Sequence, residues 1–218
     1  MYIDQPQQKS ELWQKDITEA KRILREKWDE IEAVKLTNQR RVLKAFQQHQ
    51  VGEHHFAGST GYGYNDSGRE VIEALYAQVF GAEDGLVRPQ LVSGTHAIAT
   101  CLTALLEPGD ELVSITGAPY DTLQQVIGVK GELATSLLKA GITYKEVALD
   151  EKGQWSPVGT KDAVSSKTKM VLIQRSRGYS WRSAFTIQEI YEMCTLVKKI
   201  SPTTIIFVDN CYGEFVEE

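Results

Sequence analysis

The sequence predicts an α/β protein with a mostly parallel sheet that helices cover on both faces, preceded by an N-terminal helical arm. Residues 10–48 are rich in charged and amide side chains, with apolar residues at helical spacing. From residue 69 onward, short apolar runs alternate with amphipathic stretches, as in a sheet built from parallel strands. We therefore divide the chain into a helical arm, residues 1–51, and a partial large domain, residues 52–218.

The arm is predicted to be an amphipathic helix with a break near Thr37-Asn38. No heptad pattern persists for three full turns, so packing on its own domain is favoured over a zipper with a partner. A glycine-rich connection, residues 52–68, follows the arm. The apolar positions of the arm helix are Ile17, Ala20, Leu24, Ile31 and Val34.

The large domain is predicted to alternate strands with helices. Strands are expected where short apolar runs occur, at residues 86–92, 111–116, 143–149, 170–174 and 205–208. Helices are expected at residues 68–81, 95–106, 120–127 and 133–140, and after the capping box of Thr186 and Glu189. Open α/β sheets hold their ligands at the carboxyl ends of the strands, so the residues that follow the strands are the candidates for a site.

Composition excludes several classes of protein. The 218 residues are 42% hydrophobic, enough for a sizeable core, and a net charge of -5 argues against a nucleic-acid surface. Three widely spaced cysteines form no C-x-x-C motif, so we predict a reducing, cytoplasmic location. No signal core or membrane span is recognised, and no membrane partner is expected. His54 and His55 beside Glu53 lack the H-E-x-x-H spacing, and no metal is assigned.

The first candidate site follows the strand expected at residues 86–92. Ser93, Gly94 and Thr95 open a helix whose free N–H groups and positive dipole end can hold an anion such as a phosphate. Gly94 permits close approach of the backbone, and the two hydroxyls add donors. An ordinary helix cap uses the same residue types, so this motif alone is weak.

Three further candidates follow other strands. Tyr120 could lie flat on a planar cofactor ring, although a tyrosine half-buried between helix and loop is commoner. Arg175, Arg177 and Arg182 surround a turn, where they could bind a carboxylate or be solvated loop residues. Asp209 could pair with a protonated ring nitrogen, or could only mark a cap or turn.

A phosphate cradle, a stacking aromatic, a carboxylate and an arginine are together what pyridoxal 5'-phosphate (PLP) and an amino acid substrate require. The order of LVSGTHA, APYDTL, the arginine turn and IIFVDNCYGEF resembles the large domain of PLP-dependent transferase-like (fold type I) enzymes. The longer motifs HHFAGSTGYGYNDSGRE, SGTHAI, QRSRGYSWR and VDNCYGEF resemble the bacterial methionine gamma-lyase family, also called aluminium resistance proteins and similar to cystathionine beta-lyases. This resemblance covers nearly all of residues 30–218.

The resemblance implies a role for each motif. The Ser93–Thr95 turn would bind the PLP phosphate, Tyr120 would stack on the ring, and Asp209 would pair with the ring nitrogen. Tyr62 and Tyr64 fall where related enzymes send an aromatic across a dimer interface to the neighbour's phosphate. The resemblance therefore implies a homodimer or homotetramer.

The resemblance also implies a carbon–sulfur lyase. PLP would withdraw electrons from the α carbon of a sulfur-containing amino acid, and β- or γ-elimination would release a thiol. Arg177 is assigned to the substrate, although the QRSRGYS turn departs from the Ser-Asn-Pro turn of better-known relatives. His96 could line the pocket or pack within its helix.

The Schiff-base lysine is the one expected residue that the sequence lacks. In fold type I enzymes it follows the aspartate strand, whereas the last lysine here, Lys199, precedes Asp209. We therefore expect an N-terminal portion of such an enzyme, inactive alone, without the C-terminal part and the small domain. Another fold type I reaction, such as transamination or decarboxylation, and a non-catalytic dimerisation or binding module are the alternatives.

Overall fold

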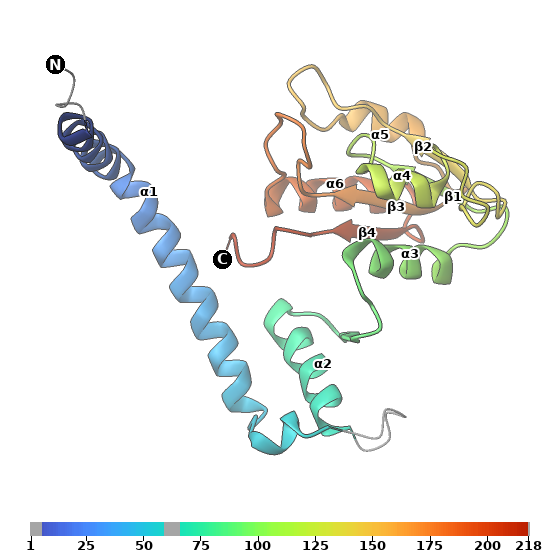
Figure 1. The fold of residues 1–218 in the computed structure, drawn as a ribbon. Coiled ribbons are helices and arrows are strands. Elements are labelled where there is room, and N and C mark those ends of the chain that lie inside the picture. The colour runs from blue at the N-terminus through green and yellow to red at the C-terminus, as the bar shows by residue number, and fades with distance from the viewer. Residues whose placement is uncertain (1–5, 59–65, 218) are drawn as a thin grey trace. The chain divides into compact units, whose positions relative to one another are not determined.

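The computed structural model of the chain describes residues 6–58 and 66–217 (Figure 1). The chain forms two compact units. The first, here called the N-terminal unit, comprises Met1–Val87 with Phe215–Glu218, and the second, the sheet unit, comprises Arg88–Glu214. The boundary between an arm and a large domain at residue 51 stays a prediction.

The N-terminal unit is helical in the residues that the structure describes. Helix α1 (Pro6–Gln48) is followed by the 3-10 turn η1 (Glu53–Phe56) and by helix α2 (Ser67–Phe80). Ala45 of α1 packs with Leu75 and Val79 of α2 in a small apolar core. The C-terminal part of α1 therefore packs on α2, whereas apolar side chains nearer its N-terminus, such as Ile17 and Ile31, are exposed.

The predicted break in α1 near Thr37-Asn38 is wrong. Asn38 is buried, and its Nδ2 donates to the carbonyl oxygens of Phe215 and Glu217 at 3.2 and 3.0 Å. Asparagine disfavours helices because its side chain competes for backbone hydrogen bonds. Here that side chain finds partners outside the helix, and the helix continues through it.

The sheet unit is built on a parallel sheet with the strand order β2-β1-β3-β4. In the described part of this unit the strands are β1 (Glu111–Ser114), β2 (Thr143–Glu146), β3 (Thr168–Gln174) and β4 (Ile205–Asp209). The helices are α3 (Gly94–Leu105), α4 (Asp121–Ile127), α5 (Pro157–Ala163) and α6 (Ile187–Ile200).

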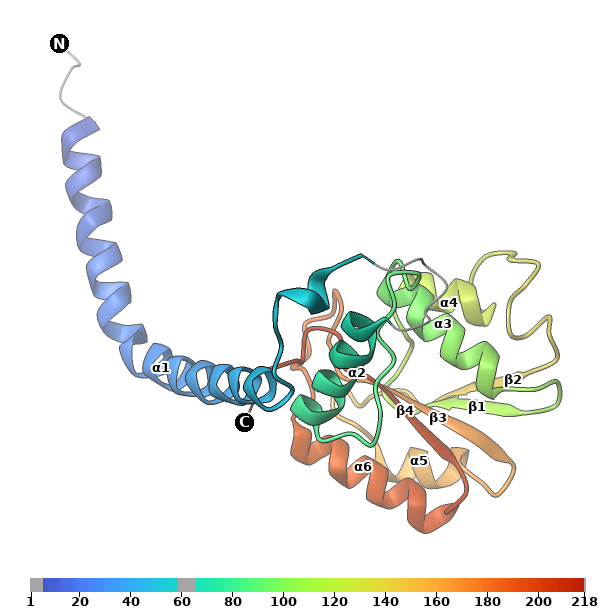
Figure 2. The same ribbon diagram turned by 90° about the horizontal axis from the view of Figure 1, so that it is seen from below.

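Two apolar cores lie on opposite faces of this sheet. Leu112 and Leu172 belong to the core beneath α3 and α4, whereas Val113 and Val171 belong to the core that α6 covers. Figure 2 shows α3 and α4 on one side of the strands, and α5 and α6 on the other. Successive side chains of a strand point to opposite faces, so a continuous apolar run fills both cores.

One predicted strand, at residues 86–92, is wrong. This stretch forms a loop, in which Leu86 and Val92 are 67% and 79% exposed. Pro89 in its middle cannot donate a backbone hydrogen bond to a neighbouring strand. An apolar run that no layer covers gains little from strand formation.

The helix predicted at residues 133–140 is also wrong. This stretch consists of turns, and the N–H groups of Leu137 and Leu138 donate to the carbonyls of Val126 and Ile127 at the end of α4. Bonds within the stretch, such as Ala140 N–H to the Ser136 carbonyl, form isolated turns and not a helix, and the pairing with α4 ties these turns to the neighbouring segment. In contrast, α5 was not expected, although Ser156 and Pro157 supply a helix cap and a first-turn proline.

The predicted α/β class, with a parallel sheet covered by helices on both faces, is confirmed. The other predicted strands and helices of the sheet unit are present, with shifted ends. Among the described residues, no helix combines the length and apolar character needed to cross a membrane.

Candidate active site

The carboxyl ends of three adjacent strands carry the candidate residues. Tyr120 follows β1, Gln174 ends β3, and Asp209 ends β4 directly beside Gln174 in the strand register. Strand β1 has β2 on one side and β3 on the other, so the strand order reverses there. Ligands of open α/β sheets bind at such a switch point.

The Ser93–Thr95 turn begins helix α3. Ser93 Oγ accepts the His96 N–H at 3.1 Å, which makes Ser93 the helix cap. The N–H groups of Gly94 and Thr95 lie in the first turn, where the helix itself offers no acceptor. A Cβ at Gly94 would meet no protein atom within 4 Å, so the space beside it is open. Free N–H groups, a helix dipole and open space fit the phosphate of PLP.

Tyr120 is joined to this turn. Its hydroxyl oxygen lies 3.0 Å from Thr95 Oγ1, which is 3.2 Å from Thr122 Oγ1. Burial raises the pKa of Tyr120, the hydrogen bond to Thr95 opposes that rise, and the charges of Asp209 and Cys211 add to it. The phenol is therefore protonated at neutral pH. The structure thus places Tyr120 beside the Ser93–Thr95 turn, and the roles of both toward a cofactor stay predictions.

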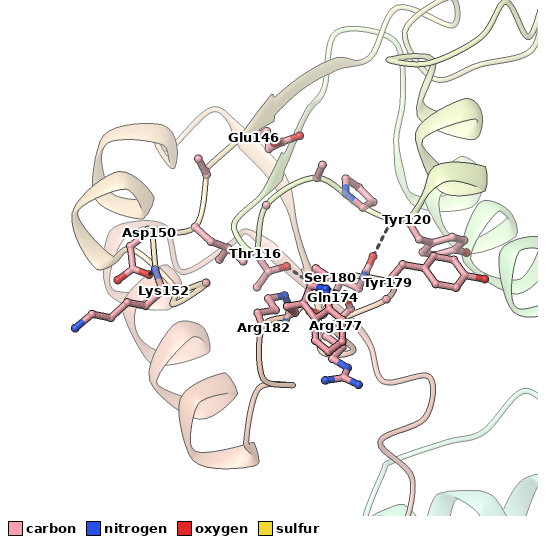
Figure 3. Close-up of a pocket in the computed structure, with 18 of the residues that line it drawn as sticks. Thr116, Tyr120, Glu146, Asp150, Lys152, Gln174, Arg177, Tyr179, Ser180 and Arg182 are labelled. Carbon is pink, nitrogen blue, oxygen red and sulfur yellow. Dashed lines mark hydrogen bonds between the residues drawn. The ribbon is translucent and has the colours of Figure 1, made fainter.

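Gln174 was not identified from the sequence. Its Oε1 accepts the Tyr120 N–H at 2.9 Å, and its Nε2 donates to the Ser176 carbonyl at 3.1 Å. Its own N–H donates to Thr116 Oγ1 at 2.9 Å. Figure 3 shows Gln174 between Thr116 and Tyr120. The signal available in the sequence was a glutamine at the end of the otherwise apolar run MVLIQ. The structure shows that this glutamine is buried.

Asp209 is buried, at 6% exposure. Burial raises the pKa of its carboxyl, the Cys211 N–H, 3.1 Å from Oδ1, lowers it, and the charge of Glu214 raises it, with a net rise. The Tyr120 N–H binds Gln174, which is the strand neighbour of Asp209, and the charge of Asp209 helps to raise the pKa of Tyr120. A nearby cation, such as a protonated pyridine nitrogen, would favour the ionised carboxyl.

A cavity of about 710 Å³ adjoins Tyr120. It lies between the loops that follow β1, β2 and β3, and its lining includes Thr116, Tyr120, Gln174, Arg177, Tyr179 and Arg182 (Figure 3). Its volume is ample for a small amino acid beside a cofactor ring.

The three arginines of the turn have different environments. Arg175 is buried, donates through Nε to the Phe185 carbonyl at 2.9 Å, and is not among the residues that line the cavity. Arg182 lines the cavity but donates to the carbonyls of Ser176 and Ser183. Arg177 is exposed and lines the cavity, which leaves it the best placed of the three to meet a ligand.

Of the remaining candidates, the structure describes His96 but not Tyr62 and Tyr64. His96 is exposed, and its Nδ1 accepts the Val92 N–H at 3.4 Å, so it does not pack within the core. Like Asp209 and the Ser93–Thr95 turn, it is not among the residues that line the cavity beside Tyr120. Tyr62 and Tyr64 lie outside the described residues, and their predicted roles stay predictions.

Comparison with known proteins identifies close relatives. The family model described as methionine gamma-lyase matches residues 13–218. The uncharacterized protein YnbB of Bacillus subtilis (strain 168) is 52% identical over 190 residues, which cover 87% of this chain and 45% of YnbB.

Solved structures agree with this match. A candidate cystathionine beta-lyase involved in aluminium resistance from Listeria innocua superposes with a TM-score of 0.90 at 48% identity, over 94% of this chain and 50% of that protein. The pyridoxal-5'-phosphate dependent protein YhfS from Escherichia coli shares the fold alone, with a TM-score of 0.55 at 19% identity, over 80% of this chain and 43% of YhfS. The chain thus spans about half the length of the relatives it matches.

Proposed function

Because this chain belongs to the methionine gamma-lyase family, we propose that it forms the cofactor-binding part of a PLP-dependent carbon–sulfur lyase. The substrate would be a sulfur-containing amino acid, cleaved by β- or γ-elimination. The observation that carries the proposal is a series of contacts at one edge of the sheet: Thr95 contacts Tyr120, whose N–H binds Gln174, the strand neighbour of Asp209.

Each of these residues would hold one part of the cofactor. The N–H groups of Gly94 and Thr95 would donate to the phosphate, with Ser93 and Thr95 hydroxyls beside them. Tyr120 would cover one face of the ring, and the Asp209 carboxylate would pair with the ring nitrogen. PLP, when bound, supplies an electron sink for the α carbon of the amino acid.

The electron sink requires a protonated ring nitrogen, and the charge of Asp209 would keep that nitrogen protonated. A buried carboxylate is costly to ionise, and the raised pKa of Asp209 reflects this cost. A pyridinium nitrogen in contact with Asp209 compensates the buried negative charge, and the carboxylate in turn keeps the nitrogen protonated. Asp209 thus holds a proton on the ring nitrogen throughout the reaction.

Arg177 would bind the substrate carboxylate. It lies on the turn after β3, lines the cavity beside Tyr120, and carries a planar guanidinium suited to bidentate contact with a carboxylate. We assign the Schiff-base lysine to none of residues 1–218, because no lysine follows Asp209 in them. A homodimer or homotetramer, with Tyr62 and Tyr64 at the neighbour's phosphate, is part of the proposal.

Cofactor binding is tested with pyridoxamine 5'-phosphate, whose amine cannot form Schiff bases with surface lysines. We expect saturable binding to one site per chain, and much weaker binding of pyridoxamine, which lacks the phosphate. Asp209→Ala should weaken binding about tenfold to a hundredfold, as for a lost hydrogen bond to a charged group. Asp162→Ala, at an exposed acid of α5, should leave binding unchanged. Equal affinity in wild type and Asp209→Ala would contradict the proposal.

The elimination reaction is tested on the native protein, purified from the organism that produces it. L-cystathionine, L-cysteine and L-methionine are supplied with PLP, and released thiol, keto acid and ammonia are measured. A keto acid without a thiol would indicate transamination instead of a lyase reaction.

A further inference from the structure

We propose that Arg175 is a positioning residue that sets the hydrogen bond received by the Asp209 carboxylate, acting through the turn Asn210–Gly213. This inference rests on the proposed role of Asp209 and assigns a new residue to the same site. Arg175 is the first residue after β3 and belongs to the QRSRGYS turn, where the sequence suggests a substrate arginine, but it is buried and donates hydrogen bonds to Phe185, Asn210 and Gly213.

The guanidinium of Arg175 joins two separate loops. It donates through Nε to the Phe185 carbonyl at 2.9 Å, just before α6. Its Nη1 donates to Asn210 Oδ1 at 2.9 Å and to the Gly213 carbonyl at 2.8 Å. The backbone N–H of Arg175 also donates to the Asp209 carbonyl at 3.0 Å. One buried side chain therefore fixes both ends of the turn that follows Asp209.

The turn itself is closely packed and strained. The Gly213 N–H donates to the Asn210 carbonyl at 2.8 Å, and Tyr212 has a φ of 68°, which a bulky residue rarely adopts. A Cβ at Gly213 would collide with the side chains of Asn210 and Arg175. A strained conformation persists only where its surroundings enforce it, and here the Arg175 hydrogen bonds do so.

The result of this geometry is one hydrogen bond at the carboxylate. The turn directs the Cys211 N–H at Asp209 Oδ1, 3.1 Å away. That bond lowers the pKa of a carboxyl that burial raises. Among the described residues, the ionisable groups whose charges interact with that of Asp209 are the Tyr120 phenol, the Cys211 thiol and the Glu214 carboxyl. Of the interactions identified for Asp209, the Cys211 N–H is the one that favours the ionised form.

The inference is tested by titrating the Asp209 carboxyl with ¹³C NMR in the chain without cofactor. Asp209→Asn identifies the signal. In Arg175→Lys, which keeps the charge but loses the fork of donors, the midpoint should rise by about one pH unit, the effect of one lost N–H hydrogen bond. Lys199→Met, which removes an exposed charge of α6, should leave the midpoint unchanged. An unchanged midpoint in folded Arg175→Lys would overturn the inference.

A second variant covers the case in which Arg175→Lys does not fold. Asn210→Ala removes one acceptor of the guanidinium while keeping Arg175, and should raise the same midpoint by a smaller amount. An unchanged midpoint in Asn210→Ala would then overturn the inference. A purely structural role for Arg175 would lower the melting temperature without moving the midpoint.

The same variants separate this inference from the proposed function. The pH at which pyridoxamine 5'-phosphate binding is half-maximal should move upward in Arg175→Lys and Asn210→Ala, in step with the carboxyl titration. If wild type bound no pyridoxamine 5'-phosphate, the proposed function would fail, and the ¹³C midpoint would still decide the role of Arg175.

Discussion

The hydroxyl oxygens of Thr95 and Tyr120 lie 3.0 Å apart, although the two residues are 25 positions apart in the sequence. Thr95 stands in the first turn of α3, and Tyr120 precedes α4 on the loop that follows β1. This contact joins the helix end that fits a phosphate to the aromatic ring that fits a pyridine. The contact therefore brings two parts of the proposed cofactor site together.

Thr95→Ala should weaken binding of pyridoxamine 5'-phosphate about threefold to tenfold, the effect of one neutral hydrogen bond. The loss comes from the missing hydroxyl and from the freed Tyr120 side chain. Thr95→Ser keeps the hydroxyl and should bind nearly as well as wild type. Equal affinity of the alanine and serine variants in equilibrium dialysis would show that this hydroxyl does not hold the ligand.

Gln174→Leu should destabilise the chain by about 1–3 kcal/mol, because it removes the buried Gln174 side chain that accepts the partly buried Tyr120 N–H. Urea unfolding monitored by circular dichroism measures this difference. Gln125→Leu, at an exposed position of α4, is the matched control and should change the unfolding free energy little. Similar stability of the Gln174 and Gln125 variants would argue against the hydrogen bond to Tyr120.

Glu111→Gln should destabilise the chain at neutral pH, by about 0.5–1.5 kcal/mol. Burial by itself would raise the pKa of Glu111, but hydrogen bonds from Lys145 and Thr168 and the charge of Lys145 bring it below its usual value. A lowered folded pKa gives stability above the unfolded value, near 4.3, which is lost as pH falls through the folded pKa.

The pH dependence distinguishes this ion pair from a packing effect. The difference in unfolding free energy between wild type and Glu111→Gln should shrink as pH falls below about 4. Glu132→Gln, at an exposed loop position, should behave like wild type at every pH. A difference that stays constant from pH 7 to the acid range would exclude the charge of Glu111 as its cause.

Asp209→Asn should stabilise the cofactor-free chain at neutral pH while weakening cofactor binding. The raised pKa of Asp209 means that ionising this carboxyl costs folding free energy, and that cost appears as pH rises from the unfolded pKa through the folded one. Asparagine keeps an acceptor for the Cys211 N–H and carries no charge. The melting temperatures of the two proteins should therefore converge in acid, and a lower melting temperature of the variant at pH 7 would contradict this expectation.

The sheet could be predicted because its strands are recognisable in the sequence as short, continuous apolar runs. Residues 170–173 and 205–208 are apolar runs whose alternate side chains fill two cores, a pattern that a surface segment does not need. The run at residues 86–92 has similar composition but no covering layer, and only tertiary context distinguishes the two cases. The turns at residues 133–140 pair with α4 in a way that helical spacing cannot foresee.

The site could be predicted where residues follow strands in a fixed order. The positions of Tyr120 and Asp209 follow from the rule that parallel strands bring their carboxyl ends to one edge. The roles of Gln174 and Arg175 could not be predicted, because they depend on which loop each side chain reaches. From sequence alone, Arg175 and Arg177 are two equivalent loop arginines, but one is buried and the other lines the cavity.

A crystal structure of the chain with pyridoxamine 5'-phosphate is the most direct measurement. We predict the phosphate at the N–H groups of Gly94 and Thr95, the ring against Tyr120, and the ring nitrogen within hydrogen-bond distance of Asp209. A ligand bound elsewhere, or a ring nitrogen turned away from Asp209, would contradict the proposed cofactor site.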